Sequence, residues 1–92
     1  MVYIVTYDLY NEVGPQPYQA LVTLIKEEKI WARLGGSSYL IESDKSAREL
    51  RDLYTSVLDR NDKIFVGKVS APAAWYGYSE EVSKWIRNKL DK

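Results

Sequence analysis

Residues 2–9 constrain the fold more than any other segment, because they predict a strand that is apolar on both of its faces. Side chains alternate from one face of a strand to the other. The two faces carry Val2, Ile4, Thr6 and Asp8 on one side, and Tyr3, Val5, Tyr7 and Leu9 on the other. A strand of this kind belongs at the centre of a sheet that is covered on both sides.

Turn and helix signals divide the rest of the chain into further elements. After a loop over residues 11–17, they are a helix from Pro17 to about Glu28, strands over residues 30–34 and 38–43, a helix from Ser46, a strand over residues 63–70, and a helix after Ser79. A hairpin, or a bend around a glycine bulge, joins the two short strands at Gly35-Gly36. This order predicts an α+β fold, a ferredoxin-like βαββαβ sandwich with an added C-terminal helix.

The predicted helices have recognisable ends and apolar stripes. Ser46 and Glu49 match a capping box, in which each side chain binds a free backbone amide of the first turn. Ser79 is placed to cap the last helix, with Glu80 at its positive end and Lys89 at its negative end. The stripes consist of Tyr18, Leu21, Val22 and Ile25, then Leu50, Leu53, Tyr54, Val57 and Leu58, and finally Val82, Trp85, Ile86 and Leu90.

A chain of 92 residues has room for one domain, with its core in residues 2–70 and a tail with the last helix in residues 71–92. Two helices cover one face of such a sheet, and the apolar strands predict a cover for the other face as well. The last helix could supply it through Trp75, Trp85 and Ile86. A second copy of the chain is the other candidate, and we expect a homodimer because two-fold dimers are the commonest oligomers.

Composition removes several kinds of chemistry. The chain has no cysteine and no histidine, which excludes disulfides, thiolate or imidazole metal ligands, cysteine nucleophiles and histidine general bases. Thirteen basic residues balance 13 acidic ones, so no excess charge predicts general nucleic-acid binding, although a local basic face stays open. The start lacks a basic leader and no stretch reaches about 20 apolar residues, so we expect a cytoplasmic protein outside the membrane.

Asp8 is the first candidate functional residue, because it is a carboxylate at the end of an apolar strand. Such a carboxylate can bind a hard cation such as magnesium, which keeps several of its waters. One carboxylate per chain is too few for a protein-made cage, but two copies of Asp8 in a two-fold dimer could share one ion. The structural alternative is that Asp8 accepts backbone amides of the following loop.

Arg33, Ser37 and Ser38 flank Gly35-Gly36 and form a candidate phosphate site. Small residues beside an arginine let a phosphate approach backbone amides. The fuller phosphate-loop motifs are not matched, and a bent strand or a hairpin turn is the structural alternative.

Two charged pairs are better explained by structure than by binding. Asp59 and Asp62 lack the spacing and glycine of a calcium loop, so they predict a turn between a helix and a strand. Arg48 and Arg51 lie three residues apart on the second helix and could contact phosphates, but a solvated helix face is the default interpretation.

Aromatic residues make up 13% of the chain. Tyr3, Tyr7, Tyr39 and Trp31 could stack on bases, as exposed aromatics do in RNA-binding sheets. The motif of those sheets is absent, which favours packing in the core or at an interface.

The opening strand resembles that of a known family. Residues 3–9 are similar to the strand with a terminal Tyr-Asp in the small CRISPR-associated adaptation protein, the second of the two universal ones, whose relatives include the VapD-type toxin ribonucleases. Arg33, Ser37 and Tyr39 have the spacing of that family's arginine, serine and aromatic residue, and residues 62–66 are similar to its last core strand. A branch of small bacterial and phage proteins resembles this chain further, in its Tyr-Asp, Ser-Ser-Tyr-Leu and Pro-Ala-Ala-Trp runs.

This resemblance implies a ferredoxin-like homodimer in which Asp8 binds magnesium and supports phosphodiester cleavage. Our leading hypothesis is therefore a nucleic-acid-associated protein that acts as a metal-dependent nuclease, with Arg33 and Ser37 holding the phosphate. The alternative is a non-catalytic interaction protein, for example of phage or mobile-element origin, that binds a protein partner. A third option, a small-ligand-binding regulatory domain, has no pocket signature in the sequence.

Overall fold

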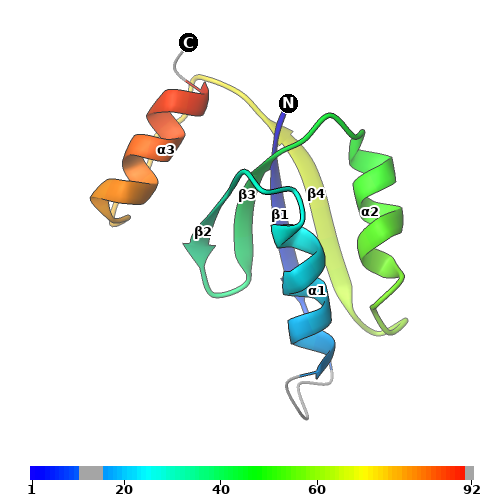
Figure 1. Cartoon of the computed structure of the whole chain (residues 1–92). Helices are drawn as coiled ribbons and strands as arrows, with labels where there is room; N and C mark the ends of the chain where they lie inside the picture. Colours follow the sequence, from blue (N-terminus) through cyan, green and yellow to red (C-terminus); the bar gives the residue numbers. More distant parts are fainter. Residues whose placement is uncertain (11–15, 91–92) are drawn as a thin grey trace.

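The computed structural model describes residues 1–10 and 16–90, and their strands and helices follow the predicted order. The elements are β1 (Val2–Asp8), α1 (Gln16–Lys26), β2 (Trp31–Gly35), β3 (Ser38–Glu42), α2 (Ala47–Thr55), β4 (Lys63–Val69) and α3 (Glu80–Leu90) (Figure 1). The α+β class is confirmed, with a four-stranded antiparallel sheet and three helices in the described residues. Most of the loop expected over residues 11–17 lies outside them.

β1 lies inside the sheet, as its two apolar faces predict. The strand order is β2-β3-β1-β4, so β1 pairs with β3 on one side and with β4 on the other. Val5 of β1 lies opposite Tyr39 of β3 and Val66 of β4. β2 and β4 are consequently the two edge strands of this sheet.

α1 and α2 cover one face of the sheet and form the main core with it (Figure 1). This face receives Tyr3, Val5 and Tyr7 from β1, as the strand alternation predicts. The predicted helix stripes are confirmed, because Leu21 and Ile25 of α1 are fully buried. Leu50 and Tyr54 of α2 are fully buried as well.

α3 lies on the opposite face of the sheet and covers part of it (Figure 1). Ile86 is buried there against Val2 and Leu40. Trp75 and Trp85 pack around this cluster, and the Trp75 indole N–H donates to the Ser83 hydroxyl at 3.1 Å. The predicted contacts of the last helix are thus confirmed. These contacts cover the part of this face where β1 begins, using residues of the same chain. The expected homodimer stays a prediction.

The ends of the predicted elements agree with the structure to within a few residues. β2 begins at Trp31, one residue later than the predicted start at Ile30. The two short strands form a hairpin, in which Gly35 ends β2 at φ 127° and Gly36 lies in the turn at φ 49°. Both values lie in the left-handed region, which costs a glycine little because it has no Cβ. The register shifts between Arg33 and Gly35, so both predicted readings, hairpin and bulge, apply.

The predicted helix caps are also present. The Glu49 backbone N–H donates to the Ser46 hydroxyl at 3.1 Å, and the Ser46 backbone N–H donates to the Glu49 carboxylate at 3.0 Å. These hydrogen bonds lower the pKa of Glu49 below its ordinary value. At α3, the Val82 backbone N–H donates to the Ser79 hydroxyl at 3.2 Å. Local hydrogen bonding therefore fixes where both helices begin.

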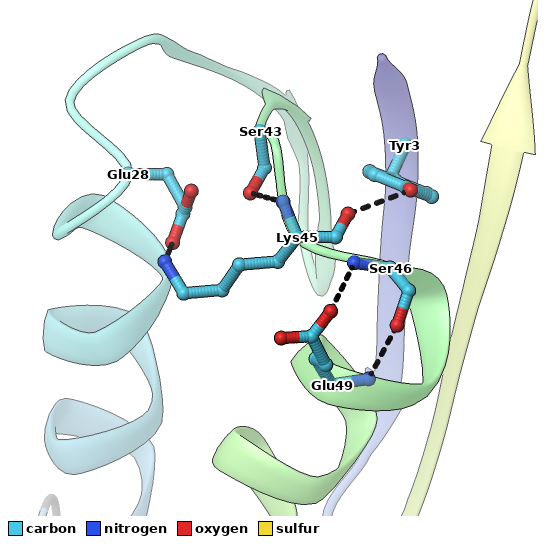
Figure 2. Close-up of polar contacts among 6 residues, drawn as sticks. All are labelled: Tyr3, Glu28, Ser43, Lys45, Ser46 and Glu49. Atoms are coloured by element: carbon cyan, nitrogen blue, oxygen red, sulfur yellow. Dashed lines mark hydrogen bonds and ion pairs between the residues drawn. The ribbon is translucent and has the colours of Figure 1, made fainter.

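A polar network ties the first residues of β1 to the ends of α1, β3 and α2 (Figure 2). The Tyr3 hydroxyl donates to the Lys45 carbonyl at 2.8 Å, and the Lys45 backbone N–H donates to the Ser43 hydroxyl at 3.1 Å. The Lys45 ammonium pairs with the Glu28 carboxylate at 3.0 Å. We call this region, made of Tyr3, Glu28, Ser43 and Lys45, the Tyr3 end of the sheet.

Among the described residues, no helix combines the length and the apolar character needed to cross a bilayer.

Candidate functional site

Asp8 lies at the end of β1 far from the Tyr3 end, on the face of the sheet that α3 partly covers. Strand alternation assigns this face, because Val2 and Ile4 pack with α3 and Asp8 has the same parity. The Asp8 side chain is exposed, and Lys63 of β4 lies directly opposite it in the register. The carboxylate thus lies beside a cation on a surface open to ligands.

Phe65 of β4 is the most prominent neighbour of Asp8 on this face. It lies opposite Thr6 in the register and is 62% exposed, which is unusual for a phenylalanine in a sheet. Its ring lies over Gly67, since a Cβ at that position would approach the ring to 2.6 Å. The glycine therefore leaves room for the ring to lie against the strand.

Two hydroxyls complete the same surface. The Ser38 hydroxyl of β3 donates to the Thr6 hydroxyl of β1 at 3.0 Å, and the two residues are cross-strand partners. We call the surface made of Thr6, Asp8, Ser38, Lys63 and Phe65 the Asp8 end of the sheet. A hollow of about 220 Å³ opens between β1 and β4 here, lined by Asp8, Lys63 and Phe65 among others. The surface combines a carboxylate, a cation, hydroxyls and an exposed ring.

The structure places Ser37 beside the Asp8 end. The Tyr7 backbone N–H donates to the Ser37 carbonyl at 3.1 Å, so the hairpin turn lies next to the residue that precedes Asp8. Ser37 is half-buried. Of the two predicted phosphate ligands, Ser37 therefore lies at the same end of the sheet as Asp8.

Arg33 lies on the other face of the sheet. Its cross-strand partner is Tyr39, which is buried under α1 and α2, and its guanidinium donates to the Gly36 carbonyl at 3.4 Å. The register shifts between Arg33 and Gly35, so the alternation of side chains along β2 does not continue unchanged into the hairpin turn. Asp8 and Arg33 are thus directed to opposite faces, and one phosphate at the Asp8 end would not meet both.

The predicted aromatic candidates belong to the core. Tyr3, Tyr7 and Tyr39 are between 2% and 6% exposed, which confirms packing as their role. Burial raises the pKa of Tyr7, and the neighbouring Tyr18 hydroxyl raises it further. Burial also raises the pKa of Tyr39. Neither phenol is therefore a source of phenolate at neutral pH. Trp31 is partly buried, with the Lys26 ammonium 4.7 Å from its ring centroid.

The other charged candidates have the structural roles that we favoured. The Asp62 carboxylate accepts from the backbone N–H groups of Tyr10 and Asp59, each at 2.8 Å. Arg51 pairs with its exposed neighbour Asp52 at 2.8 Å, and Arg48 is exposed on the same helix. In residues 1–10 and 16–90, no three or more acidic side chains gather into a group that could hold a metal ion.

Sequence reasoning missed Phe65 and Lys63. The segment KIFVGKV predicts a strand, but its apolar residues 64–66 are consecutive, so nothing in it distinguishes a buried phenylalanine from an exposed one. The available signal was Gly67, two residues along the same face, because a glycine inside a strand marks a close approach by another group.

Comparison of the sequence with known protein families and with curated proteins finds no match. The function must therefore be argued from the site itself.

Proposed function

We propose that this chain is a nucleic-acid-associated protein that binds single strands at the Asp8 end and hydrolyses phosphodiester bonds there with magnesium. The observation that carries the proposal is the exposed Phe65 ring beside Lys63 and Asp8 on one sheet surface. An aromatic ring on an open sheet stacks with unpaired bases, and a neighbouring cation contacts the phosphate. A base in a duplex is already stacked, so this surface suits single strands.

The proposal includes a ferredoxin-like fold. Its support is the strand order β2-β3-β1-β4 together with the order of helices between the strands, which is that of a split βαβ arrangement. α3 is then the added C-terminal helix. In this fold α1 and α2 lie on one face, which leaves the other face for α3 and for a ligand.

Asp8 is the residue that would bind magnesium. Its carboxylate is exposed, and the Thr6 and Ser38 hydroxyls on the same face can bind water molecules around an ion. Sparse ligation of this kind fits magnesium, and a homodimer in which two copies of Asp8 share the ion fits it better. A bound magnesium ion would supply an activated water or stabilise the leaving oxygen. Lys63 and Ser37 would contact the phosphate in place of Arg33, which lies on the far face.

A cleavage assay tests the catalytic part of the proposal. Labelled RNA, single-stranded DNA and duplex DNA are incubated with the protein and magnesium or manganese, with and without chelator. We expect metal-dependent cleavage of a single strand, lost in Asp8→Asn and kept in Asp44→Asn. Asp44 is an exposed carboxylate next to the Tyr3 end, so its variant controls for the loss of one negative charge. Equal cleavage by Asp8→Asn would contradict the nuclease.

A binding assay tests the surface independently of cleavage. Phe65→Ala should weaken binding of a labelled single strand in chelator by about 10-fold, since stacking contributes roughly 1–3 kcal/mol per base. Tyr76→Ala is the matched control, because Tyr76 is 98% exposed and lies outside the Asp8 end. Equal losses in both variants would place the binding elsewhere.

A non-catalytic interaction protein is the second candidate, and one observation favours it. An apolar hollow of about 240 Å³ lies between the sheet and α3, with Tyr76 and Tyr78 among its lining residues. Trp75 is half-buried against the cluster of Val2, Leu40 and Ile86, so it belongs to the cover of the sheet inside this chain. Absence of both binding and cleavage in the assays above would favour this candidate over the nuclease.

A further inference from the structure

β2 forms one edge of the sheet. β2 is the last strand on its side of the sheet and pairs only with β3 among the described elements. The Glu42 backbone N–H donates to the Ile30 carbonyl at 2.9 Å, so Ile30 occupies a hydrogen-bonding position opposite Glu42, while its own N–H donates to the Glu28 carbonyl. Hydrogen-bonded pairs alternate along antiparallel strands. The backbone groups of Ala32 therefore point to β3, and those of Trp31 and Arg33 point outward.

A groove of about 460 Å³ runs along this edge, between β2 and the first turns of α3. Val82 and Trp85 of α3 line one wall together with Ala32, and this wall is apolar. Trp31 and Arg33 belong to the other face of β2, where Tyr39 and the helices α1 and α2 pack. A strand added here would thus meet apolar side chains on one face and Trp31 with Arg33 on the other.

Cations predominate around the groove. Lys29 and Arg33 line it, and the Lys26 ammonium lies over the Trp31 ring at 4.7 Å. Among the described residues that line it, Glu81 is the single anion. The charge at this edge therefore complements a ligand with carboxylates.

We propose that the groove between β2 and α3 binds an extended acidic segment of a protein partner, which joins the sheet as a strand beside β2. The partner's backbone exchanges hydrogen bonds with Trp31 and Arg33. Its alternate side chains are acidic toward Arg33 and Lys29, and aliphatic toward Ala32, Val82 and Trp85. This mode takes its affinity from main-chain hydrogen bonds and its specificity from alternate side chains.

A peptide fits the groove better than a nucleic acid does. The outward N–H and C=O groups of Trp31 and Arg33 alternate as donor and acceptor, which is the pattern of a peptide strand. A nucleic acid would use the cations and leave these groups without partners. The inference goes beyond the nucleic-acid function proposed above, since it depends on neither Asp8 nor Phe65.

The first test uses a fluorescein-labelled, acetylated hexapeptide of alternating Glu and Val, with a Lys and Val hexapeptide as the matched probe. Anisotropy with the full chain should give saturable binding of the acidic peptide, at least about 10-fold tighter than that of the basic one. In amide NMR spectra of the full chain, the acidic peptide should shift Trp31 and Arg33 and slow their hydrogen exchange. The amides of β4, the opposite edge, should not respond.

Two substitutions of Arg33 separate the contribution of its backbone N–H to peptide binding from that of its charge. Arg33→Ala removes the cation, and Arg33→Pro also removes an N–H that β3 does not use, so the hairpin can still form. We expect Arg33→Ala to raise the Kd of the acidic peptide about 5-fold, and Arg33→Pro to raise it about 5-fold more, the equivalent of one hydrogen bond. Lys68→Ala, on the opposite edge strand, should leave the Kd unchanged. Amide spectra of Arg33→Pro check that β2 and β3 remain paired.

Several results would overturn the inference. They are equal binding of the two peptides, no binding of the acidic peptide up to about 1 mM, or peptide-induced shifts confined to residues outside β2 and α3. Protection of the Trp31 and Arg33 amides without peptide, in a chain that light scattering finds dimeric, would show that a second copy occupies the edge. Equal Kd values for Arg33→Ala and Arg33→Pro would exclude strand addition and leave only charge attraction. Each of these readouts is unaffected by Asp8→Asn, so failure here and failure of the nuclease are distinguishable.

Discussion

The polar groups at the two ends of β1 differ in whether the protein itself supplies their partners. At the Tyr3 end the polar groups are partnered inside the protein, as the 2.8 Å hydrogen bond from Tyr3 to the Lys45 carbonyl illustrates (Figure 2). At the Asp8 end, Asp8, Lys63 and Phe65 are exposed to solvent. Buried polar groups must be paired to avoid a desolvation cost, whereas exposed ones stay available to a ligand. The contrast identifies the first end as structural and the second as the candidate site.

The chain path explains the contrast. The connection from β3 to α2 passes over the Tyr3 end and supplies Ser43, Lys45 and the cap at Ser46. On the other face, α3 packs against Val2 and Leu40 at this same end. On this face the described cover is therefore concentrated where β1 begins, and the surface is left open where β1 ends. The other face is covered along the whole strand, since Tyr7 and Leu9 are buried in the main core.

The largest effect on stability should come from Tyr3→Ala. It removes a ring that is 2% exposed in the main core, and we expect the free energy of unfolding to fall by about 3–5 kcal/mol. Phe65→Ala, at the other end, should change it by less than about 0.5 kcal/mol. Urea unfolding followed by tryptophan fluorescence measures both. If Tyr3→Ala does not fold, Tyr3→Phe isolates the hydroxyl and should cost about 1 kcal/mol. Similar losses at the two positions would contradict the comparison.

Glu28→Gln should have the next largest effect, and its effect should depend on pH. Burial alone would raise the pKa of Glu28, but hydrogen bonds from Ser43 and Lys45 outweigh it and hold the pKa below its ordinary value. A depressed carboxyl pKa stabilises the fold above the unfolded value of about 4.3, and this stability is lost as the pH falls through the folded value. We expect a loss of about 1 kcal/mol at pH 7 that shrinks in acid. Denaturant midpoints at pH 7 and pH 3.5 measure it, and a pH-independent loss would exclude the ion pair.

Ser46→Ala tests the cap at the Tyr3 end. The substitution leaves the Glu49 backbone N–H without its acceptor, and we expect the free energy of unfolding to fall by about 1 kcal/mol. Ser70→Ala, at an exposed serine just after β4, is the control and should be silent. Thermal unfolding followed by circular dichroism compares them. Equal melting temperatures for Ser46→Ala and the wild type would mean that solvent satisfies this amide equally well.

Asp8→Asn should have the smallest effect on stability, below about 0.5 kcal/mol in urea unfolding. Asp8 is exposed, so removing its charge leaves no buried group without a partner. A loss of more than about 1 kcal/mol would instead support the structural alternative, in which Asp8 accepts backbone amides of the following loop. This measurement also decides whether loss of cleavage in Asp8→Asn can be assigned to the site.

Much of the fold could be predicted because its signals are local. The capping box of Ser46 and Glu49, the cap at Ser79 and the stripe of Leu50 and Tyr54 each depend on residues within one or two turns of helix. The candidate site was predictable only in part. Asp8 stood out as a carboxylate ending an apolar strand, whereas Phe65 did not, because exposure depends on which other element covers that face.

Local sequence patterns were enough to predict the order of strands and helices, the two apolar faces of β1, the positions of the helix caps and the exclusion of cysteine and histidine chemistry. The packing of distant elements set the rest: α3 covers the beginning of β1 on one face and leaves Asp8 and Phe65 exposed. It also decided that Arg33 lies on the face opposite Asp8. The physical reason is that alternation sorts a strand's residues into two sets. Which set meets which layer depends on strand register and on the packing of distant elements.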